Sequence, residues 1–286
     1  MLTLIKRNVR LFFRNKVNFL LSLLAIFIVV ILEMVFLGNN WGGSAMQELP
    51  GIDALQYSWL AAGILAIATV TIPLGVFYII VEDRVKKINK GFYASPLKKS
   101  SLVSGYVFAA VIVTIIASLV ATVLLSILIL VQGGTLLSPL AYLQILGIIS
   151  LSSLAGTAMM FFITSLIKNH AIYTTTAMII GTLVGFLVGI YIPLGTLGEG
   201  VQRVMMLFPP SHAALLFRQV LTDSPIQTTF EGLPYEASAE FMERMGITYS
   251  FDSFEATPLI SMLILAGTAL VFYGLSMLNM RRLSKR

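Results

Sequence analysis

The sequence predicts an all-α polytopic membrane protein with six transmembrane helices, and three observations support this fold class. The first is composition: 57% of the 286 residues are hydrophobic and only 11% are charged, whereas a soluble domain carries about 25% charged residues. The second is a series of apolar stretches that reach the roughly 20 residues a helix needs to cross a bilayer core. The third is that lysine and arginine gather on one side of these stretches, as they do in cytoplasmic loops.

Six stretches are long and apolar enough to form the spans. The break between the fourth and the fifth is short, but Lys168, Asn169 and His170 are polar enough to lie at a membrane surface, and one merged span would be far too long for a bilayer. The expected spans are residues 19–37, 59–81, 102–131, 140–167, 171–192 and 259–280.

The basic residues predict the orientation of the chain. Of the 19 lysines and arginines, five lie in residues 1–18, six in residues 82–101, one is Lys168 and four follow Met280. Six spans with both termini on one side place all of these on that side. Because cytoplasmic loops carry the excess of basic residues, we expect both termini to be cytoplasmic. This distribution accounts for the net charge of +6 without a nucleic acid partner.

Residues 1–18 are predicted to form an amphipathic helix that lies in the membrane interface before the first span. A cleaved signal peptide also begins with basic residues, but the apolar run 19–37 exceeds the length of its apolar region, so the interfacial helix is favoured. The apolar side of the helix is formed by Leu2, Ile5, Val9, Phe12 and Phe13, and the basic residues displaced from it are Lys6, Arg7, Arg10 and Arg14.

The chain lacks the motifs of an enzyme. It contains no cysteine and no phosphate-binding G-x-x-x-x-G-K-[ST] loop, and its two histidines are not part of a zinc-binding motif. We therefore expect no catalytic residue, metal or cofactor on this chain. Glu33 is the single acidic residue within the predicted spans and lies about one turn from the outer end of the first. It either reaches water at the interface or lines a substrate path.

The fifth expected span carries Gly181, Gly185 and Gly189 at intervals of four residues. In a continuous helix they would lie on one face and allow another helix to approach closely. That helix belongs either to the same chain or to a second copy in a dimer. In the second span, Pro73 and Gly75 predict a kink.

Residues 193–222 differ from an ordinary outer loop, because two half-apolar segments flank Pro209 and Pro210. Each segment is about ten residues long, which is too short to cross a bilayer. We expect a re-entrant hairpin that dips into the outer leaflet, anchored on the outer side by Arg203 and Arg218, with Arg218 also a candidate partner for an acidic residue. Two amphipathic helices lying on the surface fit the pattern equally well.

Two residues predict helix ends in the outer segment. Ser211 is the expected N-cap of the helix after the proline pair. In the acidic residues 223–257 we expect a short helix that ends with Gly246 at its C′ position. This acidic stretch is either an external cap with a gating role or an ordinary solvated surface.

The charged segment 82–101 interrupts the apolar sequence between the second and third spans. We expect about two helical turns that end at Gly91, followed by Phe92 and Tyr93. Aromatic side chains framed by charges in a short cytoplasmic loop are typical of a docking element, whose apolar anchors enter a groove of a partner. Binding of anionic lipid is the alternative, but it does not account for the aromatic residues.

In the order of these features, the chain resembles the permease subunits of type-2 ATP-binding-cassette (ABC) exporters. The features are the basic amphipathic start, the six spans, the E-D-R…S-P-L-K-K sequence after the second span, and the pair of short outer helices. In that family the segment after the second span is a coupling helix that enters a groove of a separate ATPase. The coupling residues are then Glu82, Asp83, Arg84, Ser95, Pro96, Lys98 and Lys99, together with Gly91, Phe92 and Tyr93.

The resemblance implies a transporter of two permeases, identical or different, and two ATPase subunits that bind ATP and Mg²⁺. It implies export of hydrophobic or amphipathic cargo, such as drugs, antimicrobial peptides, lipids or lipid-linked glycans, across a bacterial cell membrane. Two other classes stay open on the residues alone. They are an ion-coupled secondary transporter and a non-transporting sensor or immunity protein.

Overall fold

The computed structural model describes residues 1–14, 48–88, 91, 98–251 and 254–283. Five helices in this part of the chain are long and apolar enough to cross a membrane. They confirm the predicted all-α membrane fold and correspond to the last five expected spans. The first expected span, 19–37, lies outside the described residues, and Glu33 with it. The five helices are α4 (Ile52–Val85), α6 (Lys99–Val131), α7 (Pro139–Leu166), α8 (His170–Leu187) and α12 (Pro258–Leu283).

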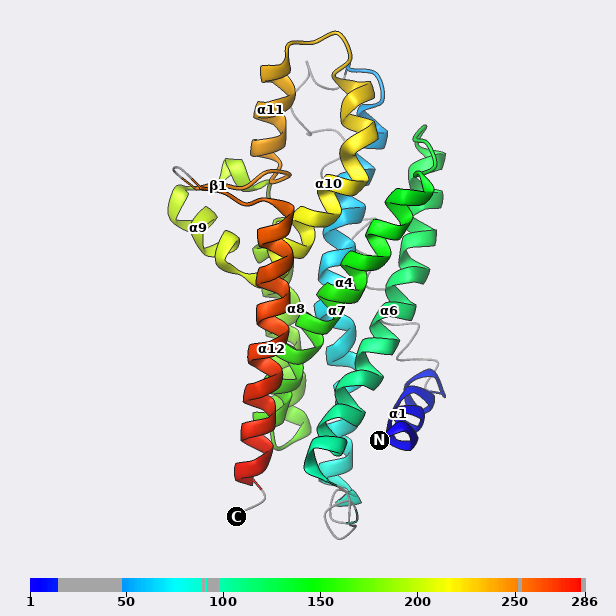
Figure 1. The fold of residues 1–286 in the computed structure, drawn as a ribbon, viewed down its shortest axis with the longest axis vertical. Helices are drawn as coiled ribbons and strands as arrows, with labels where there is room; N and C mark the ends of the chain where they lie inside the picture. The colour runs from blue at the N-terminus through cyan, green and yellow to red at the C-terminus, as the bar shows by residue number, and fades with distance from the viewer. Residues whose placement is uncertain (15–47, 89–90, 92–97, 252–253, 284–286) are drawn as a thin grey trace.

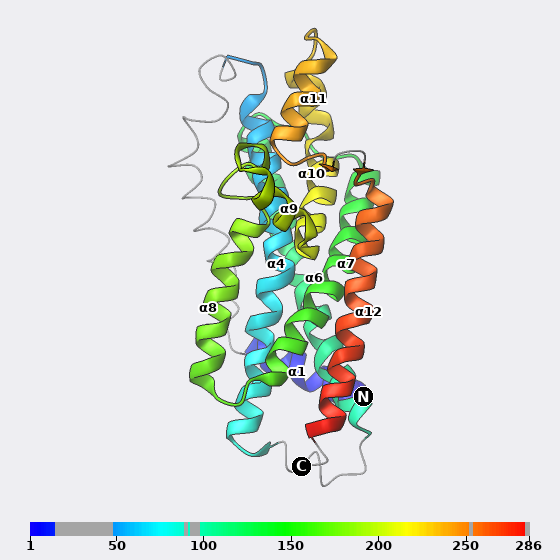
Figure 2. The ribbon, with the colours of Figure 1, turned by 90° about the vertical axis from the view of Figure 1, so that its left-hand side faces the viewer.

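The long helices run side by side along the long axis of the molecule (Figure 1). α4 is central and packs against α6, α7, α8 and the later helix α10 (Pro209–Thr229). α8 and α12 lie on opposite sides of this centre (Figure 2). Helix α1 (Leu2–Arg14) and the last residues of α12 mark one end of the bundle, the α1 end, and α11 (Tyr235–Arg244) marks the other, the α11 end.

Helix α1 packs against α6 and α4 at the α1 end. Its buried side chains are Leu4, Asn8 and Phe12, which recur every four residues along the helix. This face is rotated from the predicted one, because Leu2, expected on the apolar side, is 79% exposed. Leu4 can pack closely against α6 because Gly105 has no side chain: a Cβ atom on Gly105 would lie 2.9 Å from the Cβ of Leu4.

α4 and α7 approach each other closely near Pro73, which lies inside the continuous helix α4. Proline has no N–H, so it offers no hydrogen bond to the carbonyl of Thr69 four residues earlier. Gly156 of α7 packs against that carbonyl, and a Cβ atom on Gly156 would lie 2.3 Å from its oxygen. The two helices can therefore cross this closely only because residue 156 has no side chain.

Helix α8 ends at Leu187, earlier than predicted, because a glycine cap terminates it. Gly189 has φ +70°, and its N–H donates to the carbonyl of Phe186 at 3.0 Å. The N–H of Ile190 donates to the carbonyl of Gly185 at 3.2 Å. These two bonds form a Schellman motif, whose C′ residue adopts the left-handed conformation that glycine favours. The prediction that three glycines share one helix face is therefore wrong for Gly189.

The other two glycines of the predicted face have different surroundings. A Cβ atom on Gly185 would lie 2.4 Å from Cε2 of Tyr191, which belongs to the segment just after α8. Within the part of the chain that the structure describes, no atom lies within 4 Å of a Cβ placed on Gly181. A packing role in a dimer stays a prediction for Gly181 alone.

The outer segment contains the short turn η1 (Leu194–Thr196), α9 (Glu199–Leu207) and then α10. α10 has 21 residues, about twice the predicted length, and begins at Pro209. Proline fits the first turn of a helix because no N–H is needed there. Ser211 is therefore not the N-cap, and its hydroxyl instead donates to the carbonyls of Met205 (2.6 Å) or Phe208 (2.7 Å).

The turn between α9 and α10 lies inside the bundle. Pro209 and Pro210 share a small cavity with Thr69 of α4, Gly156 of α7 and Leu265 of α12. α10 packs against all three of these helices, and its first ten residues are almost entirely buried. This arrangement agrees with the predicted re-entrant hairpin rather than with two helices lying on a surface.

The acidic segment that follows α10 lies at the α11 end (Figure 1). α11 ends as predicted with Gly246 at C′, which has φ +65° and donates its N–H to the carbonyl of Glu243 at 3.1 Å. Two short antiparallel strands follow, β1 (Ser250–Phe251) and β2 (Phe254–Glu255). This pairing does not change the helical class of the fold.

Candidate functional site

The charged sequence Glu82-Asp83-Arg84 forms the last helical turns of α4 rather than the start of a loop. Side chains that are adjacent in the sequence point in different directions around a helix, at about 100° intervals. The three residues therefore contact different neighbours at the α1 end.

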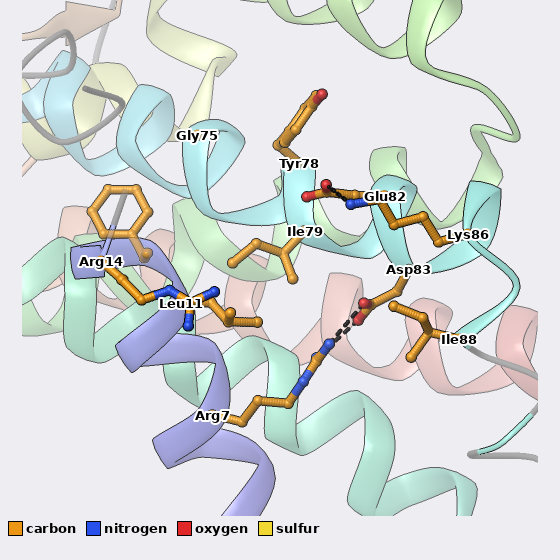
Figure 3. Close-up of a pocket in the computed structure, with 11 residues that line it drawn as sticks. Arg7, Leu11, Arg14, Gly75, Tyr78, Ile79, Glu82, Asp83, Lys86 and Ile88 are labelled. Carbon is orange, nitrogen blue, oxygen red and sulfur yellow. Dashed lines mark hydrogen bonds and ion pairs between the residues drawn. The ribbon is translucent and has the colours of Figure 1, made fainter. Parts of the chain in front are cut away.

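Asp83 joins α4 to two other helices. Its carboxylate accepts hydrogen bonds from both terminal nitrogens of Arg7 in α1, at 2.7 and 2.9 Å (Figure 3). It also accepts one from the hydroxyl of Tyr106 in α6, at 2.6 Å. Only 3% of Asp83 is exposed. A buried carboxylate is tolerated when paired and hydrogen-bonded in this way. The hydrogen bond to this carboxylate in turn raises the pKa of Arg7.

Arg84 joins α4 to the end of α7. Its guanidinium donates to the carbonyls of Thr164 (3.3 Å), Ser165 (3.3 Å) and Ile167. The last carbonyls of a helix have no partner within the helix and carry the negative end of its dipole, so an arginine there stabilises the helix end. Arg84 therefore caps α7 across 80 residues of sequence.

Glu82 has a weaker, local contact. Its carboxylate accepts a 2.6 Å hydrogen bond from Lys86, four residues later, and the side chains of Glu82 and Lys86 are 37% and 61% exposed. This hydrogen bond raises the pKa of Lys86, although an exposed pair of this kind contributes little to stability.

The remaining predicted coupling residues are only partly described. Gly91 and Lys98 are exposed, and Lys98 is the N-cap of α6. Lys99 begins α6. Phe92, Tyr93, Ser95 and Pro96 lie outside the described residues. On α1, Lys6, Arg10 and Arg14 are exposed, in contrast to the half-buried Arg7.

A second polar centre lies under the outer segment. Arg218 of α10 is 1% exposed and donates to the carbonyls of Gly189 (2.8 Å), Val188 (3.1 Å) and Gly246 (3.2 Å). Its guanidinium carbon lies 4.6 Å from the ring centroid of Trp59 in α4. The partners of Arg218 are thus backbone carbonyls and an aromatic face instead of the acidic side chain expected from the sequence.

Arg218 ties together the ends of two helices. Gly189 and Gly246 are the C′ residues of α8 and α11, so their carbonyls belong to turns with left-handed backbone. The other predicted anchor, Arg203, is exposed, and its ion pair among the described residues is a 3.8 Å contact with Glu199 one turn away. Only one of the two arginines therefore holds the outer segment to the spans.

A family model described as ABC-2 family transporter protein matches residues 46–278, which is most of the chain. The chain belongs to the ABC-2 transporter family. Members of this family are the membrane component of ABC transporters, and the ATPase is a different component. The comparison with curated proteins finds no match.

Several residues of this ABC-2 permease make contacts between helices that the sequence did not predict. Tyr106 carried no signal, because a tyrosine near the start of a span usually marks only the membrane interface. Gly156 had a weak signal, since Ser152 and Gly156 are small residues four apart. Trp59 lies at the expected start of a span. Its indole N–H donates a hydrogen bond to the carbonyl of Met245 at 2.8 Å, and nothing in the sequence indicated this contact.

Proposed function

We propose that this ABC-2 permease exports hydrophobic or amphipathic molecules, driven by ATP hydrolysis on two separate ATPase subunits. Two permease chains would form the pathway, and ATP with Mg²⁺ would bind to the ATPases. Drugs, antimicrobial peptides, lipids and lipid-linked glycans are the cargo classes that suit the family. The α1 end would face the cytoplasm and the α11 end the outside, in agreement with the distribution of basic residues.

The observation that carries this proposal is the set of contacts around Asp83. The candidate coupling segment lies between α4 and α6 in the sequence, and its first residues form the end of α4. Asp83 connects α4 to α1 and α6, and Arg84 connects it to α7. A force applied by an ATPase to the coupling segment would therefore reach four helices together, through short, charge-assisted bonds.

The distribution of charge within the described spans favours this proposal over an ion-coupled transporter. In these helices the charged residues lie only in the terminal turns, as with Asp53 and Asp83 in α4. Ion-coupled transport commonly uses ionisable groups near the middle of the membrane. An apolar or amphipathic cargo needs no such group.

The proposal is tested by purifying the tagged permease from native membranes and measuring co-purified ATPase and vanadate-sensitive ATP hydrolysis. We expect a stoichiometric ATPase with the wild type and a strong loss with the double variant Phe92→Ala, Tyr93→Ala. Tyr235→Ala is the matched control, because Tyr235 is 75% exposed at the opposite end and its loss should leave the complex intact. If no ATPase accompanies the wild-type permease, the proposal is wrong.

A further inference from the structure

A groove of about 300 Å³ lies between α1 and the second half of α4 (Figure 3). Its walls combine two kinds of side chain. The apolar part includes Leu11 of α1 and Ile79 of α4, and the charged part is formed by Arg7, Arg14, Glu82, Asp83 and Lys86. A groove with an apolar wall and a charged rim suits a ligand that has both characters.

The charges of the groove do not cancel. Both acids are already paired, Asp83 with Arg7 and Glu82 with Lys86. Arg14 is the remaining charge, and it forms no ion pair within the described residues. Three basic and two acidic side chains give the groove one net positive charge, located at Arg14. The chemistry therefore favours an anionic group near Arg14.

The position of the groove identifies the source of that group. α1 is amphipathic and lies against the ends of the spans, where a helix of this kind meets lipid headgroups. Leu11 and Arg14 face the groove from α1, and Ile79 faces it from α4 (Figure 3). A phospholipid places a phosphate beside glycerol and acyl carbons, which is the same sequence of charged and apolar contacts.

We propose that this groove binds one anionic phospholipid, with its phosphate at Arg14 and its glycerol and upper acyl carbons against Leu11 and Ile79. The bound lipid would fill the space between α1 and α4 beside the Arg7–Asp83 pair. It would thus support the helix junction at which the coupling segment begins. The binding itself does not depend on the exported cargo or on ATP.

The test is native mass spectrometry of the purified full-length permease in mixed micelles containing phosphatidylglycerol and phosphatidylcholine. We expect one tightly held phosphatidylglycerol on the wild type. Arg14→Gln should weaken its binding about fivefold, the effect of one basic residue on an anionic lipid surface. Glu82→Gln should strengthen it, because the net charge of the groove then rises.

Arg10→Gln is the matched control, because Arg10 is an exposed arginine of the same helix that does not line the groove. It should retain the bound lipid. Equal losses in Arg10→Gln and Arg14→Gln would reduce the effect to general surface attraction and overturn the proposal. Wild-type protein without a preference for phosphatidylglycerol would also overturn it, as would displacement of the lipid by millimolar inorganic phosphate. Thermal melting of each variant verifies that it is folded, and neither readout requires the ATPase.

Discussion

The guanidinium of Arg7 meets the carboxylate of Asp83 in a two-point contact, although the residues stand 76 positions apart. The contact holds helix α1 against the end of α4, the most buried of the five described spans. Tyr106 shares the carboxylate from a third helix. The start of the candidate coupling segment is therefore a junction of three helices.

Removing Arg7 should destabilise the permease more than removing Asp83. Arg7→Ala leaves the buried carboxylate with Tyr106 as its one hydrogen-bond donor among the described side chains, which we expect to cost about 3 kcal/mol. Asp83→Ala should cost less, because the half-buried Arg7 can turn its guanidinium toward water. SDS titration in mixed micelles measures both free energies of unfolding. Equal costs, or no cost, would contradict the assigned burial.

The double-mutant cycle of Arg7 and Asp83 should give a coupling energy of about 1–3 kcal/mol. The exposed pair of Glu82 and Lys86 serves as the control and should show no measurable coupling. A similar result for both pairs would mean that the Arg7–Asp83 contact is only a surface ion pair.

Gly156→Ala should destabilise the crossing of α4 and α7 by about 2 kcal/mol, in the range of overpacked cores. The added methyl group would meet the backbone of Thr69, which cannot move aside as a side chain does. Gly147→Ala is the control in the same helix, since no described atom lies within 4 Å of a Cβ there. Thermal unfolding in detergent compares the two, and a harmless Gly156→Ala would contradict the close crossing.

Gly189→Ala should cost about 1–2 kcal/mol, because the left-handed backbone is unfavourable for a residue with a Cβ. Gly181→Ala, inside α8, should be neutral or stabilising because alanine favours the helix. Thermal unfolding in detergent distinguishes a cap at Gly189 from a packing face that includes Gly181. If Gly181→Ala is the more damaging change, the glycines act as a packing face and not as a cap.

Arg218→Lys should loosen the outer segment while conserving its charge. Lysine lacks the planar fork that reaches three carbonyls, and it also loses contact with the face of Trp59, so we expect a loss of about 3 kcal/mol. Arg203→Lys is the control at an exposed position. Limited proteolysis from the outside should cleave Arg218→Lys faster in residues 223–257 and leave the control unchanged. Equal cleavage rates would contradict the anchoring role of Arg218.

The sequence predicted five described spans to within a few residues, apart from extensions of α4 and an early end of α8. Apolar length decides where a span lies, and this property is local. The pairing of Arg7 with Asp83 could not be predicted, because each charge alone fits the ordinary pattern of basic and acidic residues at a membrane surface. Gly189 was misread because spacing does not reveal where a helix stops.

In the outer segment, too, contacts between residues distant in the sequence could not be predicted. The proline pair indicated a break between two helices, and the break is there. Its depth in the bundle depends on contacts with Thr69 and Leu265, which are distant in the sequence. Arg218 looked like a surface anchor because a buried arginine bound to carbonyls has no sequence pattern of its own.

The central claim is that residues 82–98 contact an ATPase, and site-specific cross-linking tests it most directly. The chain contains no cysteine, so Tyr93→Cys introduces a single reactive site, and Tyr235→Cys provides the same site at the α11 end. In native membranes we predict that a short thiol-to-amine cross-linker joins residue 93, and not residue 235, to an ATP-binding subunit. Labelling of residue 93 by an impermeant maleimide added outside intact cells, with no ATPase cross-link, would contradict the account.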